Sequence, residues 1–233
     1  MRYGFTSIVE FFQALNNAGI RYLVLRNYEN LLEPEMYVGG HGDIDLLCDD
    51  SQAIVHLIDA KPLTRDRRNL RGDGIHYSIE VDGHSVQLDL RQVGDGYYCR
   101  QWEKELLERR VKHDCFYVMS NEDYFYTLTY HAILQKRSLS EEYRSRLFEM
   151  ARQLELAVDE PSEKGLLKLL ESHMRTHGYR YSYSQDHMVP NRFNLVDEKL
   201  IEKDRRLQLH HLGFDFMVNT IEWLVKIKHI FTR

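Results

Sequence analysis

DIDLLC, at residues 43–48, predicts a β-strand with one acidic face and one apolar face. Successive side chains of a strand point to opposite faces, so Asp43 and Asp45 project side by side. Ile44 and Leu46 point to the other face, where they can be buried. The strand therefore predicts a hydrophobic core on one side of a sheet and a polar site on the other.

A second acidic strand is expected downstream, in a β-hairpin. The alternating stretches IHYSIEV (75–81) and HSVQLDLR (84–91) are joined by Asp-Gly at 82–83, a dipeptide that favours a two-residue type I′ turn. Counting outward from such a turn places His76 opposite Asp89. One face of the hairpin is then mostly apolar, and Asp89 lies on the other.

The chain upstream of these strands predicts a helix and a further strand. Ser7 and Glu10 have the spacing of a capping box, and the amphipathic helix that follows ends at Gly19. RYLVLR, at 21–26, predicts a strand, and a short helix is expected at 51–59. Helices and strands are therefore mixed in this half.

From Ser120 onward, the apolar period changes from two to about 3.6 residues, which is the helical repeat. Helices are predicted at 121–136, 141–157, 163–177, 197–211 and 214–231. A polar, tyrosine-rich break at 178–194 is long enough to be a functional loop. We therefore predict an α+β fold, with a mixed β-sheet and flanking helices over 1–119 and a helical domain over 120–233.

The overall composition indicates a folded, helix-rich globular chain. A hydrophobic content of 43% with four prolines favours a globular core, since disordered chains lack the apolar area to offset chain entropy. The net charge of −5 is spread along the chain and gives no electrostatic reason to expect a nucleic-acid partner.

The start of the chain and its cysteines bear on localisation. The first residues lack a basic region followed by an apolar stretch, and no segment approaches the ~20 apolar residues of a membrane span. Cys48, Cys99 and Cys115 are odd in number and show no metal-type pairing, which favours a reducing compartment. We expect a cytoplasmic protein.

Asp43, Asp45 and Asp89 form a candidate metal site. Carboxylate oxygens are the hard ligands that Mg²⁺ or Mn²⁺ prefers, and three converging aspartates would repel one another without a cation. Phosphoryl chemistry needs such a cation to neutralise phosphate charge. An Asp-x-Asp alone is often a solvated strand edge, and the third aspartate is what favours a site.

The order of these elements resembles the nucleotidyltransferase superfamily. A helix, a strand ending in YLVLRN, a loop, the GDIDLL strand and a later VQLDLR strand cover roughly residues 6–120. Within the superfamily, the chain resembles uncharacterised bacterial nucleotidyltransferase-like proteins with an LRN…DIDLL core, which are associated with surface-polysaccharide assembly. YHAILQK, at 130–136, resembles the helix that follows the core in that group.

The resemblance implies a fold and an activity. The sheet would be nucleotidyltransferase-like, Asp43, Asp45 and Asp89 would be catalytic and would hold Mg²⁺ or Mn²⁺, and the helical half would lie on the acceptor side. The enzyme would transfer a nucleotidyl group from a nucleoside triphosphate to a hydroxyl of a small molecule or glycan. Two alternatives are a phospho-alcohol (polyol-phosphate) transferase of the fukutin type, using a CDP-activated donor, and a non-catalytic, antitoxin-like regulatory protein that keeps the fold.

The donor-binding region departs from the superfamily pattern. A Gly-Ser pair usually precedes the Asp-x-Asp and holds the donor phosphates, whereas this chain has Arg26-Asn27 there. We expect Arg26 and Asn27 to contact the substrate, with the Arg26 charge in place of the hydroxyl.

Two residues of the hairpin are further candidates for substrate binding. His76, opposite Asp89, would orient that carboxylate or accept a proton; the alternative is a surface cross-strand pair. Arg91 lies on the same face as Asp89, and its guanidinium matches phosphate oxygens. The alternative for Arg91 is a structural partner of the aspartates.

Lys136 is the candidate cation from the helical half. His131 lies five residues before it, about 140° around a helix, so the two would not face one ligand together. RDRRNLRGDG, at 65–74, would contact a polyanionic substrate or form a solvated loop. The stretch at 214–231 predicts a core helix, with docking on an anionic membrane surface as the alternative.

Overall fold

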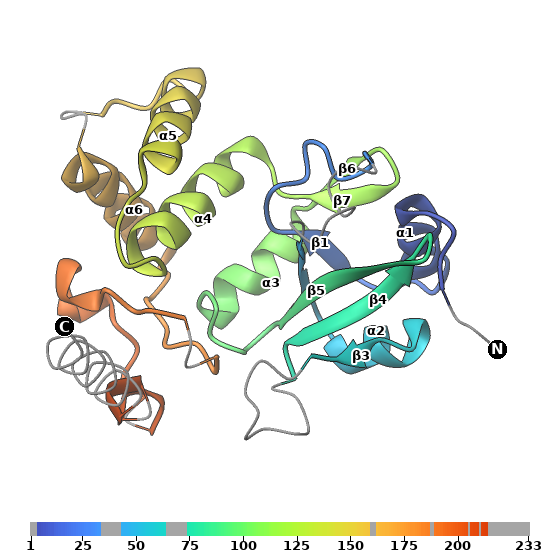
Figure 1. Cartoon of the computed structure of the whole chain (residues 1–233). Helices are drawn as coiled ribbons and strands as arrows, with labels where there is room; N and C mark the ends of the chain where they lie inside the picture. The colour runs from blue at the N-terminus through green and yellow to red at the C-terminus, as the bar shows by residue number, and fades with distance from the viewer. Residues whose placement is uncertain are drawn as a thin grey trace, which may run out of the picture.

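The structure is a computed structural model that describes residues 4–33, 43–63, 74–158, 162–186, 189–204, 206–209 and 211–213. Its centre is a seven-stranded mixed sheet in the order β3-β4-β5-β2-β1-β7-β6 (Figure 1). The strands are β1 (Tyr22–Val24), β2 (Asp43–Cys48), β3 (Lys61–Pro62), β4 (His76–Val81), β5 (His84–Gln92), β6 (Val111–His113) and β7 (Phe116–Val118). Strands and helices together confirm the predicted α+β class.

Six α-helices with described bounds accompany the sheet, and the described residues 206–209 and 211–213 are also helical. The six are α1 (Ile8–Asn17), α2 (Ser51–Ile58), α3 (Arg100–Glu108), α4 (Asn121–Leu134), α5 (Glu141–Gln153) and α6 (Glu163–His177). Two short 3₁₀ helices, Phe193–Leu195 and Glu198–Leu200, follow α6. None of these helices is long and apolar enough to cross a membrane.

The β4–β5 hairpin has the predicted register. His76 pairs with Asp89, and the turn residues Asp82 and Gly83 both have positive φ angles, 49° and 75°, as a type I′ turn requires. β5 also pairs in parallel with β2, which places Asp89 directly beside Asp45. The sequence did not predict this parallel pairing, and it is what joins the two acidic strands.

Four of the helices begin at a serine whose side chain caps the first turn. Ser7 accepts a hydrogen bond from the backbone N–H of Glu10 at the start of α1, and serines at 120, 140 and 162 cap α4, α5 and α6 in the same way. The predicted helix at 163–177 is confirmed at both ends.

Some predicted elements differ from the structure. A single helix across 197–211 is wrong, because Ile201 forms a bridge with Tyr181, and the backbone N–H of Glu202 donates to Tyr181 O at 2.8 Å. The described residues 206–209 and 211 of that range are helical, as predicted. The sequence patterns missed α3, β3 and the β6–β7 hairpin. α3 has only three apolar residues among its nine. The arginines of the 65–74 segment and the predicted helix at 214–231 lie outside the described residues.

The sheet has a hydrophobic core on each face. α1 and α2 cover one face, where Phe12 and Ile54 belong to the same buried cluster as Leu46. On the other face, Leu47 and Trp102 belong to a cluster that continues through α4 and α6. This second cluster crosses residue 120, and a division into domains at 119/120 stays a prediction.

Candidate functional site

Three aspartates meet where β2 and β5 run side by side. One carboxylate oxygen from each of Asp43, Asp45 and Asp89 lies within 4.8 Å of the others. Asp45 and Asp89 are 2% and 6% exposed, whereas Asp43 is exposed. Along β2, the face that is packed at Leu47 therefore opens into the carboxylate cluster at Asp43.

The donor set fits a hard divalent cation. An ion that binds oxygen at roughly 2.1 Å has ligand atoms about 3 to 4.2 Å apart, and the carboxylate oxygens of the cluster, all within 4.8 Å of one another, lie close to that spacing. Carboxylate oxygens suit Mg²⁺ and Mn²⁺ rather than softer metals. Asp43, Asp45 and Asp89 are thus the residues that could hold such an ion.

Arg26, just after β1, contacts the cluster directly. Its Nη2 donates to Asp45 Oδ1 at 2.8 Å and its Nη1 donates to Tyr97 Oη at 2.6 Å. Burial raises the pKa of Asp45, and the neighbouring Arg26 charge opposes that rise. Burial opposes the charge on Arg26, but the carboxylate of Asp45 holds the pKa of Arg26 well above its ordinary value. The two form a buried ion pair.

Asn27 is exposed and has a φ angle of 55°, in the left-handed region that asparagine tolerates. Among the described residues, its side chain makes no hydrogen bond to the three aspartates. The structure places Asn27 next to Arg26 at the turn after β1, and a substrate contact stays a prediction.

His76 lies across the hairpin from Asp89, with its Nε2 3.6 Å from Asp89 Oδ2. The ring is only 3% exposed, so the alternative of a surface pair is wrong. A buried imidazole at this distance can orient the carboxylate.

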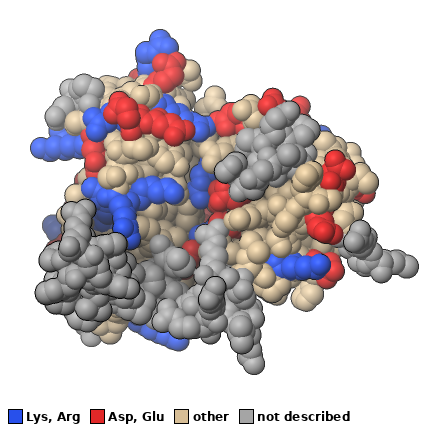
Figure 2. All heavy atoms as spheres, in the orientation of Figure 1, with Lys and Arg blue, Asp and Glu red and all other residues tan. Residues whose placement is uncertain are grey.

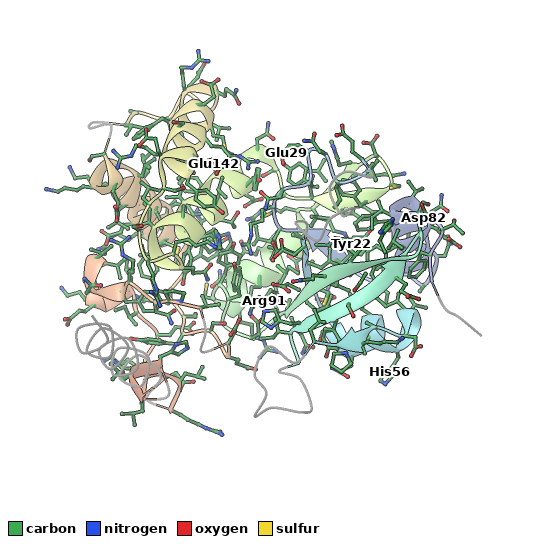
Figure 3. The ribbon with its side chains drawn as sticks, in the orientation of Figure 1. Tyr22, Glu29, His56, Asp82, Arg91 and Glu142 are labelled. Atoms are coloured by element: carbon green, nitrogen blue, oxygen red, sulfur yellow. The ribbon has the colours of Figure 1, made fainter. Side chains whose placement is uncertain are left out.

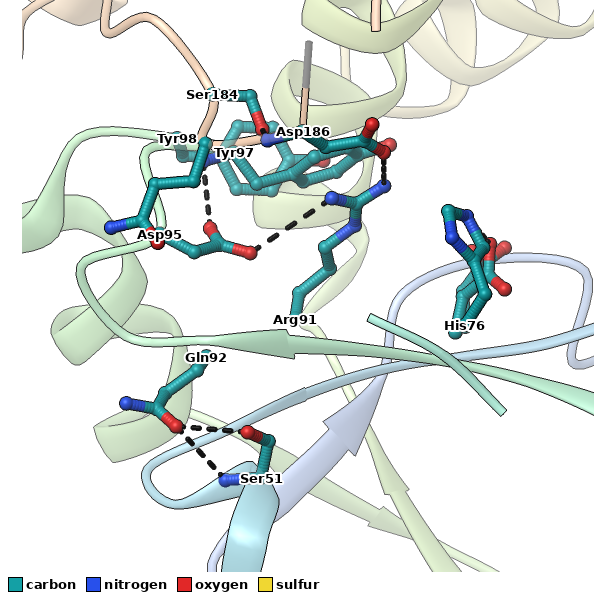
Figure 4. A network of polar contacts seen from close by, with 12 residues as sticks. Ser51, His76, Arg91, Gln92, Asp95, Tyr97, Tyr98, Ser184 and Asp186 are labelled. Carbon is teal, nitrogen blue, oxygen red and sulfur yellow. Dashed lines mark hydrogen bonds and ion pairs between the residues drawn. The ribbon is translucent and has the colours of Figure 1, made fainter. Parts of the chain in front are cut away.

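Arg91 is held by other carboxylates than the predicted ones. Its Nη2 donates to Asp186 Oδ2 at 2.9 Å, and Asp95 Oδ2 lies 3.9 Å from its Nη1 (Figure 4). The guanidinium also stacks over Tyr97, 4.4 Å from the ring centre. It lies where β5 meets the helical half (Figure 3). A phosphate could bind Arg91 only by competing with Asp186.

Lys136 and His131 both lie near Arg26, and whether they would face one ligand together stays a prediction. α4 ends at Leu134, so the angular spacing of a helix does not apply to Lys136. His131 Nδ1 is 3.2 Å from Arg26 Nη1. Partial burial of the Lys136 ammonium lowers its pKa, Arg26 lowers it further, and Asp45 opposes the shift.

Several residues of the site were not predicted. Tyr97 Oη lies 3.0 Å from His131 Nδ1, and Gln135 Nε2 donates to Tyr97 O at 2.7 Å. The spacing of His131 and Gln135, four apart on α4, was a signal that could have linked them. Tyr97 and Asp186 lie in loops without a periodic pattern, and no sequence signal marked them.

Charges of opposite sign face each other around this site. Near the middle of the view, Lys and Arg side chains over the helical half lie opposite Asp and Glu on the sheet side (Figure 2).

No protein-family model, no curated protein and no solved structure matches the chain.

Proposed function

We propose that the chain is a divalent-metal-dependent enzyme of the nucleotidyltransferase type, with a nucleotidyltransferase-like sheet. It transfers a nucleotidyl group from a nucleoside triphosphate to a hydroxyl acceptor. The convergence of Asp43, Asp45 and Asp89 within 4.8 Å, from two adjacent parallel strands, is the observation that supports this most. A rigid, acidic strand pair suits reactions in which positioning and charge neutralisation supply the catalysis.

The three aspartates would hold Mg²⁺ or Mn²⁺, and the bound ion would neutralise charge on the donor phosphates. Asp89, oriented by His76, accepts the proton of the acceptor hydroxyl. The hydroxyl oxygen at the same time forms a bond to the α-phosphorus of the donor. The bond from that phosphorus to the leaving pyrophosphate breaks. Lys136 faces the donor phosphates from the helical half.

In this proposal the acceptor binds on the side of the helical half. A sugar or other hydroxyl compound would enter beside Lys136. A glycan of a surface polysaccharide is the acceptor class that we propose, with the enzyme acting in the cytoplasm.

Asp43→Asn is the sharpest test of the metal role. Loss of this metal ligand should lower turnover about a hundred-fold or more. Because Asp43 is exposed, the substitution should change the stability of the fold little. Asp45→Asn is less suitable because it leaves the buried Arg26 unpaired, which costs about 3–5 kcal/mol. Turnover is measured by mass detection of products from all four nucleoside triphosphates, and from CDP-activated polyols for the alternative transferase.

Asp82→Asn in the hairpin turn is the matched control, since it also removes one exposed carboxylate. Equal turnover in the Asp43→Asn variant and the control would show that the cluster is not catalytic.

A non-catalytic binding function is the second candidate. Arg26 forms an ion pair with Asp45 and so neutralises part of the charge of the cluster, which is the observation that favours it. Calorimetric titration with Mn²⁺ and nucleotides separates the two functions. Absence of heat in every titration would support a fold that is kept without catalysis.

A further inference from the structure

Arg26 occupies a position from which it cannot easily leave. Its Nη2 donates to Asp45 Oδ1 at 2.8 Å, and its Nη1 contacts both Tyr97 Oη at 2.6 Å and His131 Nδ1 at 3.2 Å. The Arg26 side chain is 12% exposed and that of Asp45 is 3% exposed. Arg91 lies over the same Tyr97 ring, and Gln135 donates to the backbone oxygen of Tyr97. Tyr97, which accepts a hydrogen bond from Arg26, is therefore held in place by Arg91 and Gln135.

The charges of the cluster balance for one divalent ion. Three carboxylates and one guanidinium in direct contact leave a formal charge of −2. A site that took two divalent ions would carry a net positive charge with Arg26 still in place. Lys136 makes no ion pair with the three aspartates in the described residues and is less buried than Arg26, so it changes this balance less than Arg26 does.

We propose that Arg26 takes the place of a second divalent ion, so that the centre binds a single cation beside an Asp45 carboxylate fixed by Arg26. Arg26 is then a positioning residue and not a ligand of the donor phosphates. This inference rests on the metal role in the proposed function. It adds that the centre binds one ion, a number that the proposed function alone does not specify.

Mn²⁺ binding without nucleotide tests the proposal directly. Bound Mn²⁺ is counted by the loss of the free-ion paramagnetic resonance signal, with the full chain and MnCl₂ alone. We expect one ion per chain. Arg26→Met removes a positive charge a few ångströms from the ion and should tighten binding about ten-fold or more. Arg26→Lys retains the charge and should stay within about three-fold of the unmodified chain.

Arg21→Met is the control, because Arg21 is a partly exposed arginine paired with Asp49, away from the cluster. Two ions per chain, no measurable ion, or an Arg26→Met variant that binds no more tightly than the unmodified chain would each overturn the proposal.

A Mn²⁺-soaked crystal of the unmodified chain gives a measurement that does not depend on how the variants fold. We expect one anomalous peak, with Arg26 still on Asp45. Two peaks, or Arg26 displaced from Asp45, would contradict us. A chain that binds one ion but turns over no nucleotide loses the proposed function and keeps this inference. A chain that turns over nucleotide and binds two ions keeps the proposed function and loses this inference.

Discussion

Lys136 differs from the other two cations of the site in what it contacts. Arg26 is paired with Asp45, and Arg91 is paired with Asp186. Lys136 makes no ion pair with any residue that the structure describes. Lys136 follows the C-terminal end of α4, and its ammonium group is partly buried near Arg26 and Asp45 although the residue as a whole is exposed. Of the three, Lys136 is the one that can bind a phosphate without breaking an existing pair.

Lys136→Met should therefore raise the KM for the donor about ten-fold, with a smaller change in kcat. Because burial lowers the pKa of Lys136, donor binding should also weaken at high pH earlier than an ordinary lysine would allow. Lys136→Arg should restore binding and move that decline to higher pH. Steady-state kinetics over pH, with the exposed Lys104→Met in α3 as control, measures both effects. An unchanged KM would remove Lys136 from the site.

At the scale of elements, α6 is joined to the rest of the fold through stacked rings. His173 stacks on Tyr126 of α4 with ring centres 3.8 Å apart and lies 5.6 Å from Trp102 of α3. Burial, and then the neighbouring His177, lowers the pKa of His173 to about 4. Its Nε2 has no hydrogen-bond partner among the described residues. The ring therefore acts as an apolar part of the core.

This environment predicts a loss of stability in mild acid. The unfolded chain protonates His173 near pH 6.5, whereas the folded chain keeps it neutral down to about 4. Between these values the unfolded state binds more protons, so stability falls as the pH is lowered. The unmodified chain should therefore lose more unfolding free energy between pH 7 and pH 5 than the His173→Phe variant does. After allowance for solvent screening, the difference should be about 1 kcal/mol.

Urea unfolding at both pH values measures the difference. His56→Gln, which removes an exposed histidine of α2, is the control and should change nothing (Figure 3). If His173→Phe and the control follow the same pH dependence, the buried ring does not titrate as described.

At the scale of the whole molecule, the loop after β5 meets the segment after α6. The backbone N–H of Gln185 donates to Asp95 O at 2.7 Å, and Arg91 pairs with Asp186 across the same contact. Gly96 has a φ angle of 75°, and a Cβ there would lie 2.3 Å from Tyr183 O. The two halves approach more closely here than any side chain at position 96 would allow.

Gly96→Ala should thus cost about 2–4 kcal/mol, from strained φ and from a backbone contact that must open. Gly83→Ala has the same φ of 75° but no atom within 4 Å of the added Cβ, and should cost about 1 kcal/mol. Chemical denaturation compares the two variants. Equal losses would mean that the close approach between the halves contributes nothing beyond the strain of φ.

The sequence by itself determined the features that depend on neighbouring residues. β2 and the β4–β5 register follow from alternation and from a turn with positive φ, and α4 and α6 begin at their serine caps. Hydrogen bonds a few residues apart set these features, so a local pattern specifies them. The acidic face of β2 and the position of Asp89 opposite His76 were predicted in this way.

Only the tertiary structure decided which faces meet. The parallel pairing of β2 with β5, the contact of Arg26 with His131 105 residues away, and the pairing of Arg91 with Asp186 come from packing between distant elements. A periodic pattern states that a face is buried or polar but does not specify what lies against it. For that reason the sequence predicted the carboxylates and the cations of the site as separate candidates, and only the fold decided that Arg26 pairs with Asp45 and Arg91 with Asp186.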